Sequence, residues 1–195
     1  MSISIVKTYT LPPIDRRELF RYAGVRSADG EAPELLLRLD EAISLAEGKL
    51  APRVCFCELD ISKCDFGDSL DIKKNLRNSH SVIFFAATIG IELDRLISKY
   101  SVLSPATALL LEALGNERIE ALCDCFCADM QRCRAEAGER LRPRYSAGYG
   151  DLPLEYQRDI FAILDPSSRI GLTLNSSYLM SPSKSVTAIV GVEKI

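Results

Sequence analysis

The sequence predicts an α+β fold over a single domain, residues 1–195. Segments with strand periodicity and segments with helical periodicity follow one another without the regular alternation of a doubly wound sheet. A hydrophobic fraction of 47% is enough for a substantial core. The length fits one domain with an elaborated edge.

Strand and helix patterns follow one another irregularly in the N-terminal half. Three segments have strand patterns: residues 2–10, 54–61 and 81–88. Two segments place apolar residues at helical spacing: residues 14–22 and 32–50. Pro12-Pro13 ends the first strand, and Gly24 follows the first helix. In the second strand, we expect Cys55 and Cys57 to point inward beside Leu59.

One long helix dominates the C-terminal half. Ser104-Pro105 provides a capping serine and a proline at the first helical position, so the helix should run from there to about Gly138. Gly115 is the point where it could bend. Its second half places apolar residues on one stripe: Ile119, Leu122, Cys123, Phe126, Met130 and Cys133. The remaining predicted elements are a helix that follows Gly90 and runs through Tyr100, a helix at 155–164, and strands at 171–174 and 185–192.

Charge and hydropathy exclude several classes of function. The net charge is −3 and no basic stretch offers a phosphate-binding stripe, so we expect no nucleic-acid partner. The longest apolar run, residues 82–93, contains Glu92 and is shorter than the ~20 residues that a membrane helix needs. The N-terminus lacks the basic start and apolar block of a signal peptide. We therefore expect a cytoplasmic protein with no membrane partner.

The seven cysteines predict neither a disulfide framework nor a metal site. Their number is odd, and no export signal is present. In the run Cys123-x-Cys125-x-Cys127-x5-Cys133, helical geometry turns Cys125 away from Cys123 and Cys127. Four thiolates on one straight helix cannot enclose a metal tetrahedrally, so we expect no metal. Cys64, in a polar turn, should be the most exposed thiol.

The single histidine, His80, lies at the entrance of the strand 81–88. A lone histidine with no companion ligand is rarely catalytic. We therefore expect His80 to be structural or on the surface, which argues against a His-rich metal site and a Ser/His/Asp triad.

The stretch Arg144-Tyr145-Ser146-Ala147-Gly148-Tyr149-Gly150-Asp151 has the residue types of a ligand-binding loop. Arginine can pair bidentately with a carboxylate or phosphate. Glycines allow positive φ and a close approach of ligand to backbone N–H groups. Tyrosine offers a flat face to a cation or a heterocycle. Taken alone, the pattern also fits an ordinary turn with an exposed arginine.

Three longer motifs follow one another in the sequence. The first is Ala86-Ala-Thr-Ile-Gly-Ile-Glu-Leu-Asp-Arg-Leu-Ile, after which Ile119-Glu120-Ala121 of the long helix belongs to the same match. The other two are Arg142-Pro-Arg-Tyr-Ser-Ala-Gly-Tyr-Gly-Asp-Leu-Pro and Arg169-Ile-Gly-Leu-Thr-Leu-Asn-Ser-Ser-Tyr-Leu-Met-Ser-Pro. Together they resemble the activation domain of cobalamin-dependent methionine synthase, most closely in its short, free-standing form. The resemblance covers residues 80–192 closely and the N-terminal third more loosely.

This resemblance implies a twisted, largely antiparallel sheet with flanking helices and a shallow site for S-adenosylmethionine. It also implies a partner, a cobalamin-dependent methionine synthase that lacks its own activation domain. S-adenosylmethionine supplies a methyl group and a flavodoxin-like or other reductant supplies an electron, so that cob(II)alamin on the partner is restored. The sequence has no corrinoid-binding Asp-x-His-x-x-Gly motif. We therefore expect an accessory subunit rather than a self-sufficient enzyme.

The resemblance also assigns roles to five residues. Arg144 holds the methionine carboxylate, and Ser146 and Gly148 offer backbone contacts. Tyr149 faces the methyl group or the corrin. A family glutamate falls on Glu120, near the sulfonium.

An acidic edge on the long helix supports the assignment of Glu120. Glu117, Glu120 and Asp124 lie at helical spacing beside the apolar stripe. Negative charge attracts a sulfonium cation. A solvated acidic face is the alternative explanation.

Two departures from the family pattern concern the ligand. Ser176 stands where the family often has glutamate. Domains fused to full-length synthases continue past the strand that matches 185–192 into an aromatic strand that helps to hold adenine, whereas this sequence ends at Ile195. We therefore expect adenine recognition to be weaker or differently built.

Two alternative functions remain open. The chain could reactivate another corrinoid methyltransferase, which a neighbouring gene for a corrinoid protein would indicate. It could also be a non-catalytic docking module that has lost ligand binding, which a titration with S-adenosylmethionine distinguishes.

Overall fold

A twisted antiparallel sheet forms the centre of the molecule. Within residues 4–25 and 32–195, which the computed structural model describes, five strands are ordered β1-β2-β3-β7-β4. All neighbouring strands are antiparallel. The strands are β1 (Ile5–Thr8), β2 (Arg53–Asp60), β3 (Ser79–Thr88), β4 (Glu139–Leu141) and β7 (Ser185–Lys194). The predicted α+β class with a largely antiparallel sheet is confirmed.

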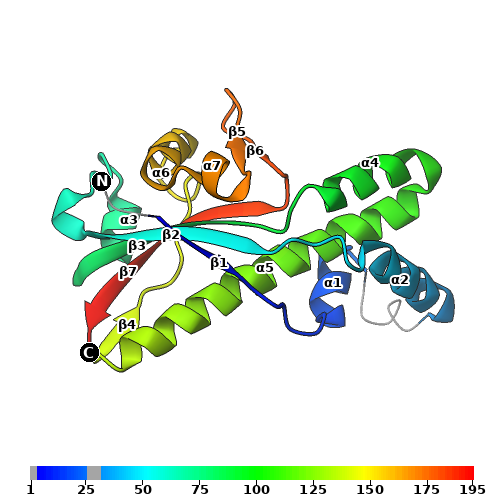
Figure 1. The fold of residues 1–195 in the computed structure, drawn as a ribbon, viewed down its shortest axis with the longest axis horizontal. Coiled ribbons are helices and arrows are strands. Elements are labelled where there is room, and N and C mark those ends of the chain that lie inside the picture. The colour runs from blue at the N-terminus through cyan, green and yellow to red at the C-terminus, as the bar shows by residue number, and fades with distance from the viewer. Residues whose placement is uncertain (1–3, 26–31) are drawn as a thin grey trace.

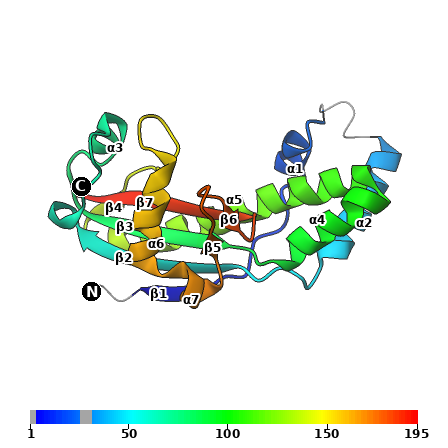
Figure 2. The ribbon, with the colours of Figure 1, turned by 90° about the horizontal axis from the view of Figure 1, so that it is seen from above.

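Helices cover both faces of this sheet (Figure 1). The helices on one side are α1 (Arg16–Tyr22), α2 (Pro33–Ala46), α4 (Glu92–Leu103) and α5 (Pro105–Ala135). Those on the other side are α3 (Leu70–Asn75), α6 (Gln157–Leu164) and α7 (Pro166–Ile170). Each side has its own buried apolar cluster. Figure 2 shows that α1, α2 and α4 gather beyond one end of the sheet, around the first turns of α5.

The long helix α5 begins where the sequence predicts. Ser104 is its N-cap, and the serine hydroxyl accepts a hydrogen bond from the N–H of Thr107 at 3.5 Å. The helix continues through Gly115, where a Cβ atom would lie 2.8 Å from Leu93 Cδ2 and 2.9 Å from Lys184 Cε. This glycine therefore lets α4 and the start of β7 approach α5 closely. Across the described ranges, no helix combines the length and apolar character needed to cross a membrane.

The central strands have the burial that their sequences predict. In β2, Cys55 and Cys57 face the side covered by α6 and α7, whereas Val54 and Phe56 face α5. Strand β3 lies between β2 and β7 and is buried along nearly its whole length. A strand that is covered on both faces has an almost continuous apolar sequence, which explains the run at 81–88.

Several short elements are not predicted by the sequence patterns. They are α3, α7, β4, the 3₁₀ helix Ile61–Lys63 and β6 (Met180–Ser181), whereas the predicted helix at 155–164 is observed as the 3₁₀ helix Leu154–Tyr156 followed by α6. Strand β6 pairs with β5 (Thr173–Leu174) in a separate hairpin, so the predicted strand at 171–174 does not join the main sheet. Two or three residues are too few for periodicity to reveal a strand. Of the predicted strand at 2–10, Ile5–Thr8 is observed, and residues 1–3 lie outside the described ranges.

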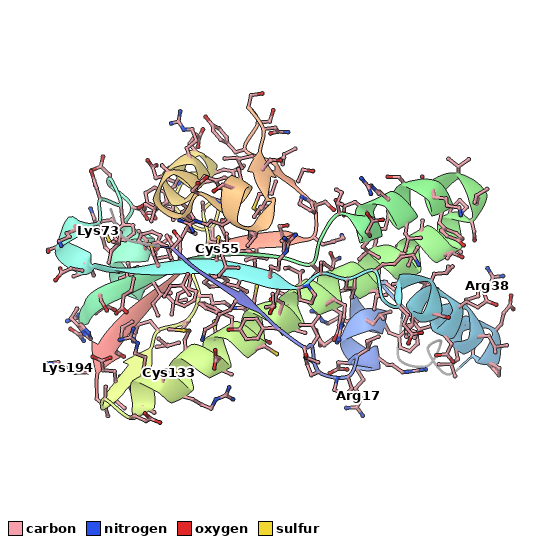
Figure 3. All side chains as sticks on the ribbon, in the orientation of Figure 1. Arg17, Arg38, Cys55, Lys73, Cys133 and Lys194 are labelled. Atoms are coloured by element: carbon pink, nitrogen blue, oxygen red, sulfur yellow. The ribbon has the colours of Figure 1, made fainter. Side chains whose placement is uncertain are left out.

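Two thiols differ in exposure from the sequence-based expectation. Cys133 is exposed, whereas Cys64 is only partly exposed and burial raises its pKa to about 11. The prediction that Cys64 is the most exposed thiol is therefore wrong, and the buried stripe of α5 ends before Cys133. In the last turns of α5, Gln131 faces β4 and accepts a hydrogen bond from the N–H of Leu141 at 2.9 Å. Cys133 follows two residues later and so points to the opposite side; Figure 3 labels it near the C-terminal end of α5.

His80 lies on the surface, as predicted. It is the exposed residue of β3, and its Nε2 atom lies 3.1 Å from Glu139 Oε1. Cys125 lines a surface hollow while Cys123 is buried, so these thiols lie on different sides of α5. Among the residues described, no group of three or more His, Cys, Asp or Glu is arranged to hold a metal ion.

Candidate functional site

Side chains from α5, the loop after β4 and strand β7 surround a shallow hollow. It is lined by Glu120, Arg144, Tyr145, Ser146, Tyr149, Val186 and Ala188. Its volume is about 300 Å³, near the lower end of the range for small-molecule sites. The fold thus brings together four predicted site residues: Glu120, Arg144, Ser146 and Tyr149.

Asp151 anchors the far end of this loop to α3. Its Oδ2 atom accepts a hydrogen bond from the N–H of Leu70 at 2.7 Å, and the Ser69 hydroxyl also donates to its carboxylate. These hydrogen bonds, that from Ser69 first, hold the pKa of Asp151 below its usual range. Gly150 has φ of 52°, and a Cβ atom there would lie 2.5 Å from Tyr145 Oη. The turn is therefore closed tightly around a glycine.

Tyr145 and Ser146 anchor the near end of the loop to β7. The N–H of Tyr145 donates to the carbonyl of Ile189 at 2.9 Å, and the N–H of Ile189 donates back at 2.8 Å. Ser146 Oγ donates to the carbonyl of Thr187 at 2.8 Å. Because both ends of the loop are held, Arg144 extends from a fixed backbone, as a pre-organised site requires.

Arg144 forms two ion pairs with α5. Its Nη2 atom lies 3.2 Å from Glu120 Oε2 and 2.7 Å from Asp124 Oδ1. The arginine side chain is 27% exposed, whereas that of Asp124 is 72% exposed. Burial lowers the pKa of Arg144, but the acidic groups around it, first Cys123 and then the two carboxylates, raise it overall. The hollow therefore has a cation in its wall at every physiological pH.

Tyr149 lines the hollow, whereas Gly148, one position earlier in the same turn, does not. Tyr149 is 70% exposed, and its backbone carbonyl accepts a hydrogen bond from Tyr145 Oη at 3.0 Å. Gly148 has φ of 88°, and its N–H donates to the carbonyl of Leu152 at 2.9 Å. The backbone contact to a ligand that the sequence predicts for Gly148 remains a prediction, and its N–H is already used within the turn.

Among solved structures, the MetH reactivation domain bound to AdoHcy is similar to this protein. The two structures superpose with a TM-score of 0.66 over 96% of this chain and 78% of that chain, at 13% sequence identity. This chain has that domain's fold. No protein-family model and no curated protein matches its sequence. At such low identity the likeness establishes the fold and leaves the site to be argued from this chain's own residues.

Glu117 does not belong to the exposed acidic edge that helical spacing predicts. It is buried, and its carboxylate pairs with the guanidinium of Arg118. Arg118 Nη1 also donates to the carbonyl of Pro12 at 2.6 Å, and Glu117 Oε1 accepts from the N–H of Asp15 at 3.1 Å. The buried pair holds the segment before α1 against α5. Helical spacing cannot reveal this, because it does not show which side of a helix another segment covers.

A second hollow of about 480 Å³ lies beside the first. Its acidic lining residues are Asp15, Glu18, the largely buried Glu117, Glu120 and Asp124. Glu120 lines both hollows, whereas Asp124 lines the second and Arg144 the first. The ion pairs of Arg144 therefore lie at the boundary between the two hollows.

Arg142, the other arginine of the loop motif, faces away from the site. Its Nε atom donates to the carbonyl of Asn75 at 2.8 Å, and Nη1 lies 3.4 Å from Glu193 Oε1. Its backbone N–H donates to the carbonyl of Gly191 at 2.8 Å. Arg142 thus joins the loop to α3 and β7, and Arg144 is the arginine available to a ligand.

Ser176 lies in the exposed turn between β5 and β6. Asn175 organises this turn, because its Oδ1 atom accepts from the N–H groups of Ser177 and Leu179, both at 2.9 Å. Ser176, which stands where the resembled family often has an acid, thus lies in a hairpin tip, and the lining of the Arg144 hollow does not include it.

The sequence does not predict three of the residues that line the hollow: Tyr145, Val186 and Ala188. Val186 and Ala188 are two residues apart on a strand, a spacing that places both on one face. That signal predicts a shared face but not the loop that packs over it. Tyr145 stands inside the loop motif, and only its bridge to Ile189 turns it toward the hollow.

Proposed function

We propose that this protein binds S-adenosylmethionine in the Arg144 hollow and supports reductive methylation of cob(II)alamin in a partner cobalamin-dependent methionine synthase. The observation that carries the proposal is the convergence of Glu120, Arg144, Ser146 and Tyr149 on one hollow. That convergence occurs in a fold shared with a reactivation domain bound to AdoHcy. The sequence motifs and the fold thus suggest the same class of ligand.

The charges of the hollow match those of S-adenosylmethionine. Arg144 offers a cation to the ligand's α-carboxylate, the type of pair in which a bidentate geometry is favoured. Glu120 lies on the facing helix, 3.2 Å from the guanidinium, where its negative charge attracts a sulfonium. The remaining proposed contacts are with the backbone of Ser146 and with the carbonyl of Gly148, because the N–H of Gly148 already donates to Leu152. A hollow of about 300 Å³ leaves part of the ligand accessible, as transfer of its methyl group to another protein requires.

Tyr149 lies at the rim where a partner's corrinoid would approach. Its ring is exposed while its backbone is held by Tyr145. In this role the ligand supplies a methyl group, and a flavodoxin-like or other reductant supplies one electron, to cobalamin on the partner. This chain contributes ligand binding and docking in the cytoplasm, as an accessory subunit.

The test follows the cob(II)alamin absorbance of a methionine synthase that lacks its own activation domain. With this protein, S-adenosylmethionine and a competent reductant present, the signal should decay and methionine synthesis should resume. Omitting any one component should prevent both. If the cob(II)alamin signal persists with all three components in excess, methionine synthase is not the partner of this protein. A calorimetric titration then separates the alternatives, because ligand binding favours another corrinoid methyltransferase and its absence favours a docking module.

A further inference from the structure

Arg144 is drawn toward the edge of the hollow that it lines. Both of its ion pairs with α5 use the same nitrogen, Nη2, and the shorter is the one with Asp124, at 2.7 Å against 3.2 Å for Glu120. Asp124 lines the neighbouring hollow and not the one lined by Arg144. The guanidinium is therefore held at the boundary, by a carboxylate that lies outside the proposed ligand site.

The backbone on both sides of this ion pair is fixed. Tyr145 is bridged to Ile189, and Ser146 Oγ is bonded to Thr187. Asp124 belongs to a helix that runs unbroken from Pro105 to Ala135. Because the backbone on both sides is fixed, a ligand carboxylate has to meet Arg144 where its guanidinium already lies, with Nη2 next to Asp124.

The ion pair between Arg144 and Asp124 is weak enough for a ligand carboxylate to displace it, yet it still competes with that carboxylate for the guanidinium. The carboxylate of Asp124 is 72% exposed, and exposed ion pairs contribute little because water and salt screen them. A ligand carboxylate that engages the guanidinium fork through two parallel hydrogen bonds forms the better pair. After the exchange, Asp124 remains nearby as a like charge that disfavours the bound carboxylate.

We propose that Asp124 competes with the ligand's α-carboxylate for Arg144, and thereby sets the affinity of the site for ligands that carry an amino-acid group. The inference rests on the proposed function, since the ligand in question is S-adenosylmethionine or AdoHcy. Glu120 has a different part, because it lines the ligand hollow itself and can face the sulfonium.

The experiment compares two ligands in the Asp124→Asn variant by calorimetry. AdoHcy carries the amino-acid group but an uncharged sulfur, so removing a negative charge does not weaken a sulfonium contact. The dissociation constant for AdoHcy should fall about two- to fivefold, the range that an exposed ion pair supports. Affinity for 5′-methylthioadenosine, which has the same nucleoside thioether without the amino-acid group, should not change.

Glu136→Gln is the matched control, because it removes one exposed negative charge at the far end of α5. It should alter neither affinity. If Asp124→Asn binds AdoHcy no more tightly than the wild type, or binds both ligands more tightly by the same factor, the inference about Asp124 is wrong while the proposed function stands. If 5′-methylthioadenosine binds neither the wild type nor Asp124→Asn, the inference about Asp124 is still supported when AdoHcy binds more tightly to Asp124→Asn but not to Glu136→Gln. Failure of the wild-type protein to bind AdoHcy or S-adenosylmethionine overturns the proposed function and this inference with it.

Discussion

Arg144 and Glu120 form an ion pair in the wall of the hollow, with Nη2 of the arginine 3.2 Å from Oε2 of the glutamate. The arginine belongs to the loop after β4 and the glutamate to α5, 24 positions earlier in the chain. Together they present one positive and one negative charge to the same small volume. A ligand with a carboxylate and a cationic centre matches both, so each charge can be tested by its own substitution.

Substitution of Arg144 should remove most of the ligand affinity. Arg144→Ala deletes the cation that pairs with the carboxylate and leaves the ligand facing Glu120 and Asp124. We expect binding of S-adenosylmethionine to weaken by ~2–4 kcal/mol in a calorimetric titration. Arg142→Ala is the control, because Arg142 contacts Asn75 and Glu193 instead. Equal losses for the two variants would contradict the assignment of Arg144.

Substitution of Glu120 should discriminate between two ligands that differ in charge at sulfur. Glu120→Gln should weaken the binding of S-adenosylmethionine relative to that of AdoHcy by about 1 kcal/mol, or about fivefold in the dissociation constant, because only S-adenosylmethionine carries a sulfonium. The ratio of the two dissociation constants is the measurement, since loss of the Arg144 contact affects both ligands alike. A ratio identical to that of the wild type would assign Glu120 to structure.

Removing the hydroxyl of Tyr149 should separate binding from reactivation. The turn at Tyr149 is held through its backbone carbonyl, so Tyr149→Phe leaves that hydrogen bond in place. AdoHcy affinity should be unchanged, whereas decay of the partner's cob(II)alamin signal should slow about two- to tenfold, the effect of one hydrogen bond. Tyr145→Phe is the comparison, because it removes the bond to the turn and should affect both measurements. Weaker AdoHcy binding with normal reactivation would refute a role for the Tyr149 hydroxyl toward the partner.

Breaking the buried ion pair of Glu117 and Arg118 should destabilise the fold strongly, whereas replacing both residues with apolar ones should destabilise it much less. Both side chains are 5% exposed. Arg118→Ala leaves a buried carboxylate without its counter-ion and should lower the free energy of unfolding by about 3–5 kcal/mol in urea. The double variant Glu117→Leu with Arg118→Met should recover most of this loss, because it leaves no buried charge. A single variant as stable as the wild type would mean that the pair does not hold the segment before α1.

Asp151 should stabilise the protein in a pH-dependent way. Its pKa is held low by the hydroxyl of Ser69 first and then by the N–H groups of α3. A lowered folded-state pKa means that the stabilisation is complete above the unfolded value of about 3.9 and is lost as pH falls through the folded value. The difference in Tm between wild type and Asp151→Ala should therefore be constant from about pH 7 to 5 and shrink in acid. Asp68→Ala, which removes a nearby exposed acid, should give no such trend.

Local signals predicted the large elements, and long-range pairing decided the small ones. The run at 81–88 indicated a buried strand by its composition, and Ser104 marked the start of α5 by its capping chemistry. Strand β4 forms because Glu139–Leu141 pairs with the end of β7. A segment of three residues is too short for its sequence pattern to predict this pairing. The hairpin of β5 and β6 likewise depends on its own pairing rather than on the main sheet.

The sequence by itself determined the α+β class and placed Arg144, Ser146 and Tyr149 in one loop, because periodicity, caps and motifs are local properties. Tertiary structure decided which charges meet. Glu117 and Glu120 are three positions apart on one helix, yet the first is covered by the segment before α1 and the second faces Arg144. Helical spacing fixes the direction of each side chain but not the neighbour that packs over it, and that neighbour determines whether a carboxylate stabilises the fold or stays available to a ligand.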